Sequence, residues 1–295
     1  MKTRLLIAAA IISSATSSSL MAGLIDFTTA EGYFGTGQFG VWGDSLQAQG
    51  GGGAIWKENT WGSFAVDAGN GLVVMDGAST YRKGIYQTPY NNTITSYTTS
   101  ISFQFDRDTT APTNSGFVVA LGFGDTTDGS GSTRVDIQLE RMNGGNSGFY
   151  RLKFWENSGA SSISNTFGWS NETLLGFSDA SDTTSDMLSL SITLERGADE
   201  NDWTLSAGLV NLDNASGVNV SSGSLAMETS LDFFNSDLYA VINSADLESK
   251  TLTSNRIIDT FSVTTAGGAV PEPGTYAMVV GALAMAFVFR RRMKR

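Results

Sequence analysis

Short segments in which apolar and polar residues alternate make up most of this chain, and Gly, Ser, Thr, Asn and Asp separate them. Alternation with a period of two is typical of β-strands that bury one face, and no longer stretch has the 3.6-residue period of an amphipathic helix. We therefore predict an all-β, antiparallel domain. The clearest strands are expected at residues 100–106, 117–123, 133–141, 148–155, 187–195, 203–212, 237–242 and 256–263.

Two of these segments, at 133–141 and 187–195, have a continuous apolar face. The segment at 187–195 is joined to that at 203–212 by a short polar connection, which predicts a hairpin. Turn signals recur at intervals suited to a β-sandwich, and no linker divides residues 23–266, so we expect one domain. The apolar faces are formed by Leu188, Leu190, Ile192 and Leu194 in one strand and by Val135, Ile137 and Leu139 in the other.

Both ends of the chain depart from this pattern. Residues 1–22 begin with two cations, continue with an apolar run at 5–12 and end with the small residue Ala22, which is typical of a secretory signal peptide cut after Ala22. The secretion translocon and signal peptidase are the partners that such a segment requires. The domain is therefore predicted to be exported.

The C-terminal end combines a proline motif with an apolar run. In the linker at 267–274, Pro271 and Pro273 fix φ and remove two backbone donors, so this segment is expected to be extended. The uncharged residues 275–289 would form a transmembrane helix roughly 22 Å long, short of the roughly 30 Å hydrocarbon core. Cations at 290–295 help it to span and place the C-terminus in the cytoplasm by the positive-inside rule: Arg290, Arg291, Arg292, Lys294 and Arg295.

This order of parts, with Val270, Pro271, Glu272 and Pro273 before the apolar run and the basic cluster, resembles the PEP-CTERM sorting signal of Gram-negative bacteria. The resemblance implies recognition by an exosortase-type membrane protease, cleavage near the motif, and delivery from a transient inner-membrane anchor to the cell surface or extracellular matrix. Such proteins are associated with extracellular polysaccharide. The alternative is a plain single-pass anchor with a proline-rich linker, in which the tail would survive.

Composition limits the chemistry of the domain. Residues 23–269 hold 28 acidic and 11 basic side chains, and this negative charge argues against nucleic-acid binding. The chain contains no Cys and no His, which excludes disulfides, thiolate nucleophiles and Ser-His-Asp catalysis. Any chemistry must rest on carboxylates, amides and aromatic rings.

The first and last segments of the domain also suggest a fold family. The opening residues 24–27 and the closing residues 256–263 resemble the first and last strands of concanavalin A-like or jelly-roll sandwiches, in which these strands often lie side by side. Many such sandwiches bind sugars, although a fold does not by itself imply a function.

Acidic residues offer two kinds of candidate site. Asp136 and Glu140 flank Gln138 on one strand face, which is similar to the acidic strand of laminarinase-type hydrolases, but their Cα atoms would be roughly 13 Å apart and Gln replaces the central acid. An ordinary amphipathic strand, with Arg134 continuing the polar face, is the preferred interpretation.

No cofactor is required, but calcium is a candidate ligand of oxygen-rich loops. The alternative is turn chemistry, in which Asp and Asn side chains bond to their own backbone. The candidate calcium ligands are Asp125 and Asp128, Asp179 with Asp182 and Asp186, residues 199–202, and the pair Asp26 and Asp259.

Aromatic residues offer a third kind. Sugars bind flat apolar rings with amides or carboxylates beside them, and Trp56, Trp61, Trp169 and Asn171 lie in such contexts. Trp155 and Trp203 are expected in the core.

The hypothesis for the whole chain is an exported, non-enzymatic β-sandwich that binds extracellular polysaccharide. The alternatives are a secreted glycoside hydrolase or lyase that uses acidic residues, and a purely structural component of a biofilm matrix.

Overall fold

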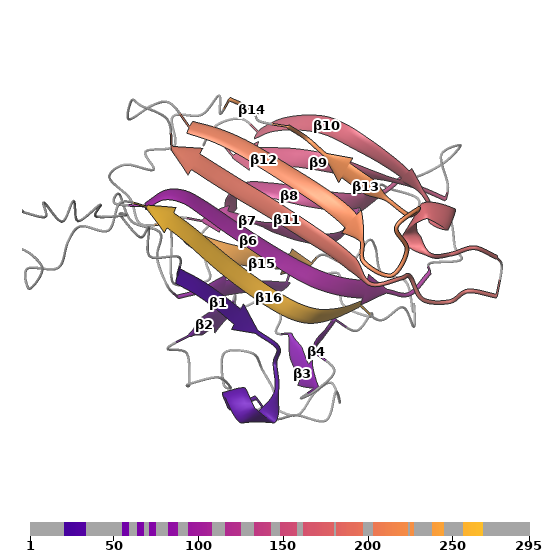
Figure 1. The fold of residues 1–295 in the computed structure, drawn as a ribbon, viewed down its shortest axis with the longest axis horizontal. Coiled ribbons are helices and arrows are strands. Elements are labelled where there is room, and N and C mark those ends of the chain that lie inside the picture. Colours follow the sequence, from indigo (N-terminus) through magenta and orange to yellow (C-terminus); the bar gives the residue numbers. More distant parts are fainter. Residues whose placement is uncertain are drawn as a thin grey trace, which may run out of the picture.

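Two antiparallel sheets packed face to face form the domain (Figure 1). The structure is a computed structural model, and it describes residues 21–33, 55–58, 64–67, 71–74, 82–87, 94–107, 116–124, 133–142, 148–157, 162–179, 181–196, 203–223, 225–226, 238–244 and 256–267. Within these residues, two short 3-10 helices, η1 (Thr29–Glu31) and η3 (Glu172–Leu175), accompany the strands.

Sheet A lies in front in Figure 1 and has the strand order β13-β12-β11-β6-β16-β4-β3, with β1 also paired to β16 and β14 to β12. Its strands are β1 (Met21–Ile25), β3 (Ala65–Asp67), β4 (Gly71–Val74), β6 (Ile94–Phe105), β11 (Leu188–Arg196), β12 (Trp203–Asn211), β13 (Asn219–Ser221), β14 (Leu225–Ala226) and β16 (Arg256–Gly267).

Sheet B lies behind sheet A and has the order β10-β9-β8-β7-β15-β5-β2. Its strands are β2 (Trp56–Glu58), β5 (Arg82–Tyr86), β7 (Gly116–Gly124), β8 (Thr133–Arg141), β9 (Phe149–Asn157), β10 (Ser162–Asn171) and β15 (Tyr239–Ser244).

Alternating apolar residues build the core between the sheets. The apolar face of β11 is completely buried, as is that of β8, and both belong to one hydrophobic cluster. Since successive side chains of a strand point to opposite faces, burial of these rows places the residues between them on the other side of each sheet. The predicted core faces of β8 and β11 are therefore confirmed.

The predicted pairings of β11 with β12 and of β1 with β16 are also confirmed. The hairpin runs in continuous register from Leu188 opposite Asn211 to Arg196 opposite Trp203. Strand β1 pairs with the last strand, with Met21 opposite Thr265 and Ile25 opposite Phe261. The first and last strands thus belong to the same sheet, as in the sandwiches that the sequence resembles.

Strand β10 was not predicted, and its geometry explains why. Its pairing with β9 shifts register between Thr166 and Gly168, which marks a β-bulge. A bulge inserts an extra residue and interrupts the period-two pattern, so the sequence of β10 does not alternate cleanly.

Among the described residues, no helix has the length and apolar character needed to cross a membrane. The signal peptide up to residue 20 and the helix predicted at 275–289 both lie outside the described residues.

The core assignment predicts a contrast between two leucines. Leu190 is completely buried, so Leu190→Ala should lower the free energy of unfolding by about 2–5 kcal/mol because it leaves a cavity. Leu212 is 55% exposed, and Leu212→Ala should change it by less than about 0.5 kcal/mol. Urea denaturation measures both, and equal effects would contradict the assignment.

Candidate functional site

The side of sheet B that faces away from the core carries most of its polar residues, and we call it the outer face of sheet B. Strand register defines two rows across this face. One row runs from Asn243 through Ala120 and Gln138 to Lys153, and the other from Val241 through Gly122 and Asp136 to Trp155. Two residues further along each strand from Gln138 and Lys153, Glu140 of β8 lies opposite Arg151 of β9.

The outer face is buried at its centre. Asp136, Gln138 and Glu140 are only 2%, 7% and 5% exposed, although they point away from the core between the sheets. Strand β8 has the amphipathic pattern that was predicted, but its polar residues are buried rather than surface residues. The side chain of Arg134 lies outside the described residues. Buried carboxylates require polar or charged partners, and the partners of Glu140 lie on the neighbouring strand β9.

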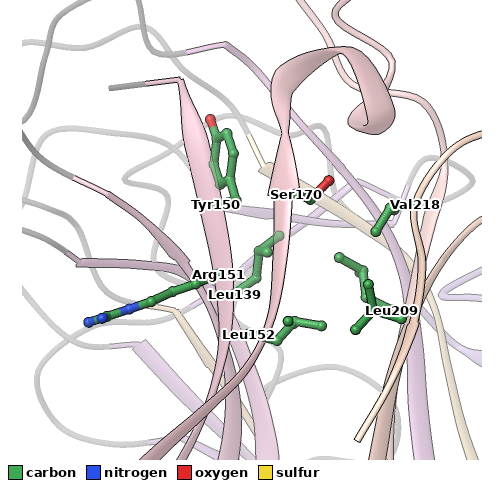
Figure 2. A pocket seen from close by; sticks show the side chains of 9 residues that line it. Leu139, Tyr150, Arg151, Leu152, Ser170, Leu209 and Val218 are labelled. Atoms are coloured by element: carbon green, nitrogen blue, oxygen red, sulfur yellow. The ribbon is translucent and has the colours of Figure 1, made fainter. Parts of the chain in front are cut away.

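Glu140 forms two ion pairs with strand β9. Its Oε2 accepts a hydrogen bond from Nε of Arg151 at 2.5 Å, and its Oε1 accepts one from Nζ of Lys153 at 2.7 Å. Figure 2 shows Arg151 pointing away from the leucines between the sheets, so the cluster belongs to the outer face. Each oxygen of this carboxylate therefore has its own cationic partner.

The acids of β8 do not form a glycosidase pair. Strand β8 pairs with β9 in unbroken register from Val135 to Arg141, so Asp136 and Glu140 are separated by four regular strand steps. Their Cα atoms are then roughly 13 Å apart, whereas paired carboxyl groups in these enzymes are about 5–10 Å apart. The strand contains no bulge that would bring them closer.

Trp155 occupies the accessible side of this face. It lies opposite Asp136 of β8 and Ser164 of β10, and it is partly exposed. The expectation that Trp155 belongs to the core was wrong, because its position in β9 alternates with the buried Leu152 and Phe154. Trp203, in contrast, is a core residue as predicted.

Trp56, a candidate sugar-binding residue, lies in the core instead. It is completely buried, and its Nε1 donates a hydrogen bond to the hydroxyl of Tyr33 at 2.9 Å. Burial raises the pKa of Tyr33 to about 12. The Trp56 ring contacts Phe261 and Tyr86, with centroids 4.9 and 5.5 Å away, so neither ring face is available to a sugar. Trp61 lies outside the described residues.

The other two sugar-binding candidates lie on β10. Trp169 pairs with Arg151 in the strand register, and its side chain lies outside the described residues. Asn171 is exposed and caps η3, since its Oδ1 accepts a hydrogen bond from the backbone N–H of Leu174 at 3.0 Å. The register thus brings Trp169 next to the ion-pair cluster, while the Asn171 oxygen has a structural partner.

Two predicted calcium sites can be compared with the structure. Asp26 follows β1, and Asp259 lies in the partner strand β16, where its Oδ2 accepts a hydrogen bond from Oγ of Ser102 at 3.3 Å. In the second loop, Asp182 accepts hydrogen bonds from Oγ of Ser178 and from the backbone of Asp179, and these bonds lower its pKa. Such bonds to the loop itself are the turn chemistry that the sequence left as the alternative.

Across the described part of the chain, no group of three or more acidic side chains is arranged to hold a metal ion. Asp125 and Asp128, like residues 199–202, lie outside that part, so calcium binding there stays a prediction.

A crevice between the sheets is a packing feature. It lies beneath β9 and β10, and the side chains gathered around it in Figure 2 are mostly apolar. It has no room for a water molecule. Its apolar lining includes Leu139, Leu152, Leu209, Val218 and Val220.

Sequence reasoning missed the contribution of β9 and β15 to the outer face. Arg151 and Lys153 alternate with core residues, which was a signal of a polar strand face, but their contact with Glu140 depends on strand order. Asn243 lies one residue beyond the predicted end of its strand and lines the same face.

Comparisons with known proteins identify the tail and the fold. Residues 269–292 match the family model for the PEP-CTERM protein-sorting motif. No sequence among the curated proteins matches the chain. The domain is similar to winged bean acidic lectin, solved with methyl-α-D-galactose, at 10% identity and a TM-score of 0.50, covering 84% of this chain and 98% of that one.

Two further lectins have similar structures. The lectin from Bauhinia forficata, solved with GalNAc, has 12% identity and a TM-score of 0.49 and covers 85% of this chain and 100% of its own. Peanut lectin, solved with a nine-residue peptide, has 9% identity and a TM-score of 0.49, covering 84% and 97%. At such identities the likeness to the winged bean protein shows a lectin-like, two-sheet sandwich and no more.

The ion-pair cluster predicts a stability effect. Glu140→Gln should lower the free energy of unfolding by about 2 kcal/mol, because it leaves two partly buried cations without their carboxylate. Glu195 is exposed on β11, and Glu195→Gln should have an effect below about 0.5 kcal/mol. Chemical denaturation of both variants measures the difference, and equal values would show that the cluster does not stabilise the fold.

Proposed function

We propose that this chain is an exported, non-enzymatic, lectin-like protein that binds extracellular polysaccharide through the outer face of sheet B. The PEP-CTERM motif at 269–292 implies export and sorting to the cell surface, with processing by an exosortase. A protein delivered to that location meets the polysaccharides of the envelope and matrix. Before processing, the tail anchors the domain in the inner membrane with the C-terminus in the cytoplasm.

The observation that carries this proposal is the partly exposed ring of Trp155 beside polar groups. Its strand neighbour across the sheet is Asp136, and Lys153 lies on the same face of β9. An indole offers a flat apolar surface to the C–H groups of a pyranose, while adjacent carboxylates, amides and amines bind its hydroxyls. This combination is what a sugar site needs.

The charge of the domain as a whole favours a neutral glycan. On the outer face, Glu140 is paired with both Arg151 and Lys153, and the register also places Lys83 of β5 there, opposite Asn243. The domain as a whole is strongly acidic and repels polyanions. Binding is therefore expected to rest on hydrogen bonds and ring stacking, with little dependence on salt.

The two alternatives make different demands. A hydrolase or lyase needs catalytic acids at a suitable separation, which the regular spacing of Asp136 and Glu140 does not support. A purely structural matrix protein needs no binding site, so it leaves the partly exposed Trp155 without a function.

Binding to a glycan array tests the proposal. The wild-type protein should bind oligosaccharides, and Trp155→Ala should weaken this binding at least tenfold because the stacking surface is lost. Val210, on β12 of sheet A and 38% exposed, is a control on the other sheet, and Val210→Ala should bind like the wild type. Equal binding by Trp155→Ala and the wild type would contradict the site, and turnover of any glycan would establish an enzyme instead.

Processing of the tail is tested by intact mass spectrometry of the protein from its native cells. The expected mass corresponds to a chain that begins at Gly23 and ends near Pro271 to Pro273, because both end segments are removed. A mass that includes Arg295 would show a permanent anchor rather than a sorting signal.

A further inference from the structure

The side of sheet A that faces away from the core, which we call the outer face of sheet A, carries no charge over five strands. Strands β1, β16, β6, β11 and β12 lie side by side in this order at the front of Figure 1. Their register defines three uncharged rows: Ala22, Thr264, Thr98, Thr193 and Ser206; Leu24, Ser262, Ser100, Ser191 and Gly208; and Thr260, Ser102, Ser189 and Val210.

Hydroxyl groups connect neighbouring strands of this face. Because these side chains are short and bonded to one another, they form a flat surface. A hydroxyl both donates and accepts hydrogen bonds, so such a surface can pair with an identical one. Three hydroxyl pairs lie within hydrogen-bond distance: Thr98 with Thr193 at 2.8 Å, Ser100 with Ser262 at 2.7 Å, and Ser102 with Thr260 at 2.7 Å.

Exposed apolar side chains lie at the two edges of the face. Leu24 on β1 is 60% exposed and Val210 on β12 is 38% exposed. Leu24 shares its row with Gly208, which has no side chain, and the two residues lie two strands from β6 on opposite sides. A two-fold axis parallel to β6 at Ser100 would therefore set Leu24 of each copy over Gly208 of the other, beside Val210.

The same axis keeps the bordering acids apart. Glu195 of β11 and Asp259 of β16 lie at opposite ends of the face. Since the axis exchanges β11 with β16, Glu195 would lie over Ala266 of the second copy and Asp259 near Ser189.

The charge of the domain favours contact through this face. Residues 23–269 hold 28 acidic and 11 basic side chains, so two copies repel each other through most of their surfaces. An uncharged, self-complementary face is where two such copies can approach most closely.

The size of the face sets the strength of the contact. Four strand spacings of about 4.8 Å and rows about 7 Å apart, with the side-chain margins, give roughly 500 Å² per copy. A dimer would then bury roughly 1,000 Å² in total, which is below the roughly 1,200 Å² of stable complexes and typical of weak, reversible ones.

We propose that the protein forms a reversible two-fold dimer in which a second copy docks on the outer face of sheet A. The contact consists of hydroxyl hydrogen bonds at the centre and of Leu24 packed against Gly208 and Val210 at both edges. The outer faces of sheet B point away from this contact, so the inference does not depend on polysaccharide binding.

Sedimentation velocity of the full chain in a mild detergent tests the inference. The wild-type protein should dimerise reversibly as its concentration rises. Ser100→Glu sets two carboxylates against each other at the axis, so the dissociation constant should rise at least tenfold. Thr166→Glu adds the same charge at an exposed position of β10, on the outer face of sheet B, and should dimerise like the wild type.

A second variant and the salt dependence keep the test independent of folding. Leu24→Ser changes a mostly exposed side chain and removes two apolar contacts per dimer, so it should weaken dimerisation about tenfold. Added salt should strengthen the dimer, because it screens the repulsion between two acidic copies.

Three results would overturn the inference. The first is a wild-type protein that stays monomeric at all concentrations. The second is a dimer that tolerates both Ser100→Glu and Leu24→Ser, because another surface would then hold it together. The third is a dimer that salt weakens, which would show an interface of ion pairs. None of these results would affect the proposed glycan site on sheet B.

Discussion

The alternation of side chains along strand β8 is the constraint on which the candidate site depends. Because Val135, Ile137 and Leu139 are buried between the sheets, the side chains of the intervening residues must lie on the opposite face of sheet B. The same core packing that stabilises the sandwich therefore directs two carboxylates and an amide to the outer face of sheet B. A register slip of one residue would place charges in the core, so the position of these polar residues is as firmly determined as the core itself.

Partners from neighbouring strands make those buried polar residues tolerable. Glu140 is stabilised by Arg151 and Lys153, which are two residues apart on β9 and hence on the same face. This arrangement holds the side chains in place, which is the kind of pre-organised polar surface that a sugar requires. Small residues of β7 separate this charged side of the face from Asn243 on β15.

The sequence predicted local features better than distant ones. The core faces of β8 and β11 and the hairpin of β11 with β12 depend on neighbouring residues, and the structure confirms them. Strand order depends on contacts between residues far apart in the chain, so the pairing of Glu140 with Arg151 could not be read from their spacing. Trp155 was assigned to the core although the local alternation with Leu152 and Phe154 places it on the other face. The burial of Trp56, in contrast, depends on contacts with the distant residues Tyr33 and Phe261. The sorting motif is a contiguous signal and was identified directly.

The chain thus combines a tail that implies transport to the cell surface with a lectin-like sandwich, and its outer face carries the residues proposed to bind sugar. Hydrogen exchange of the protein with and without a bound oligosaccharide tests most directly whether sugar binds at the outer face of sheet B. Binding at the outer face predicts slower amide exchange in β8, β9 and β15. Slower exchange confined to η3 and the loop that precedes β11, with none in sheet B, would contradict it.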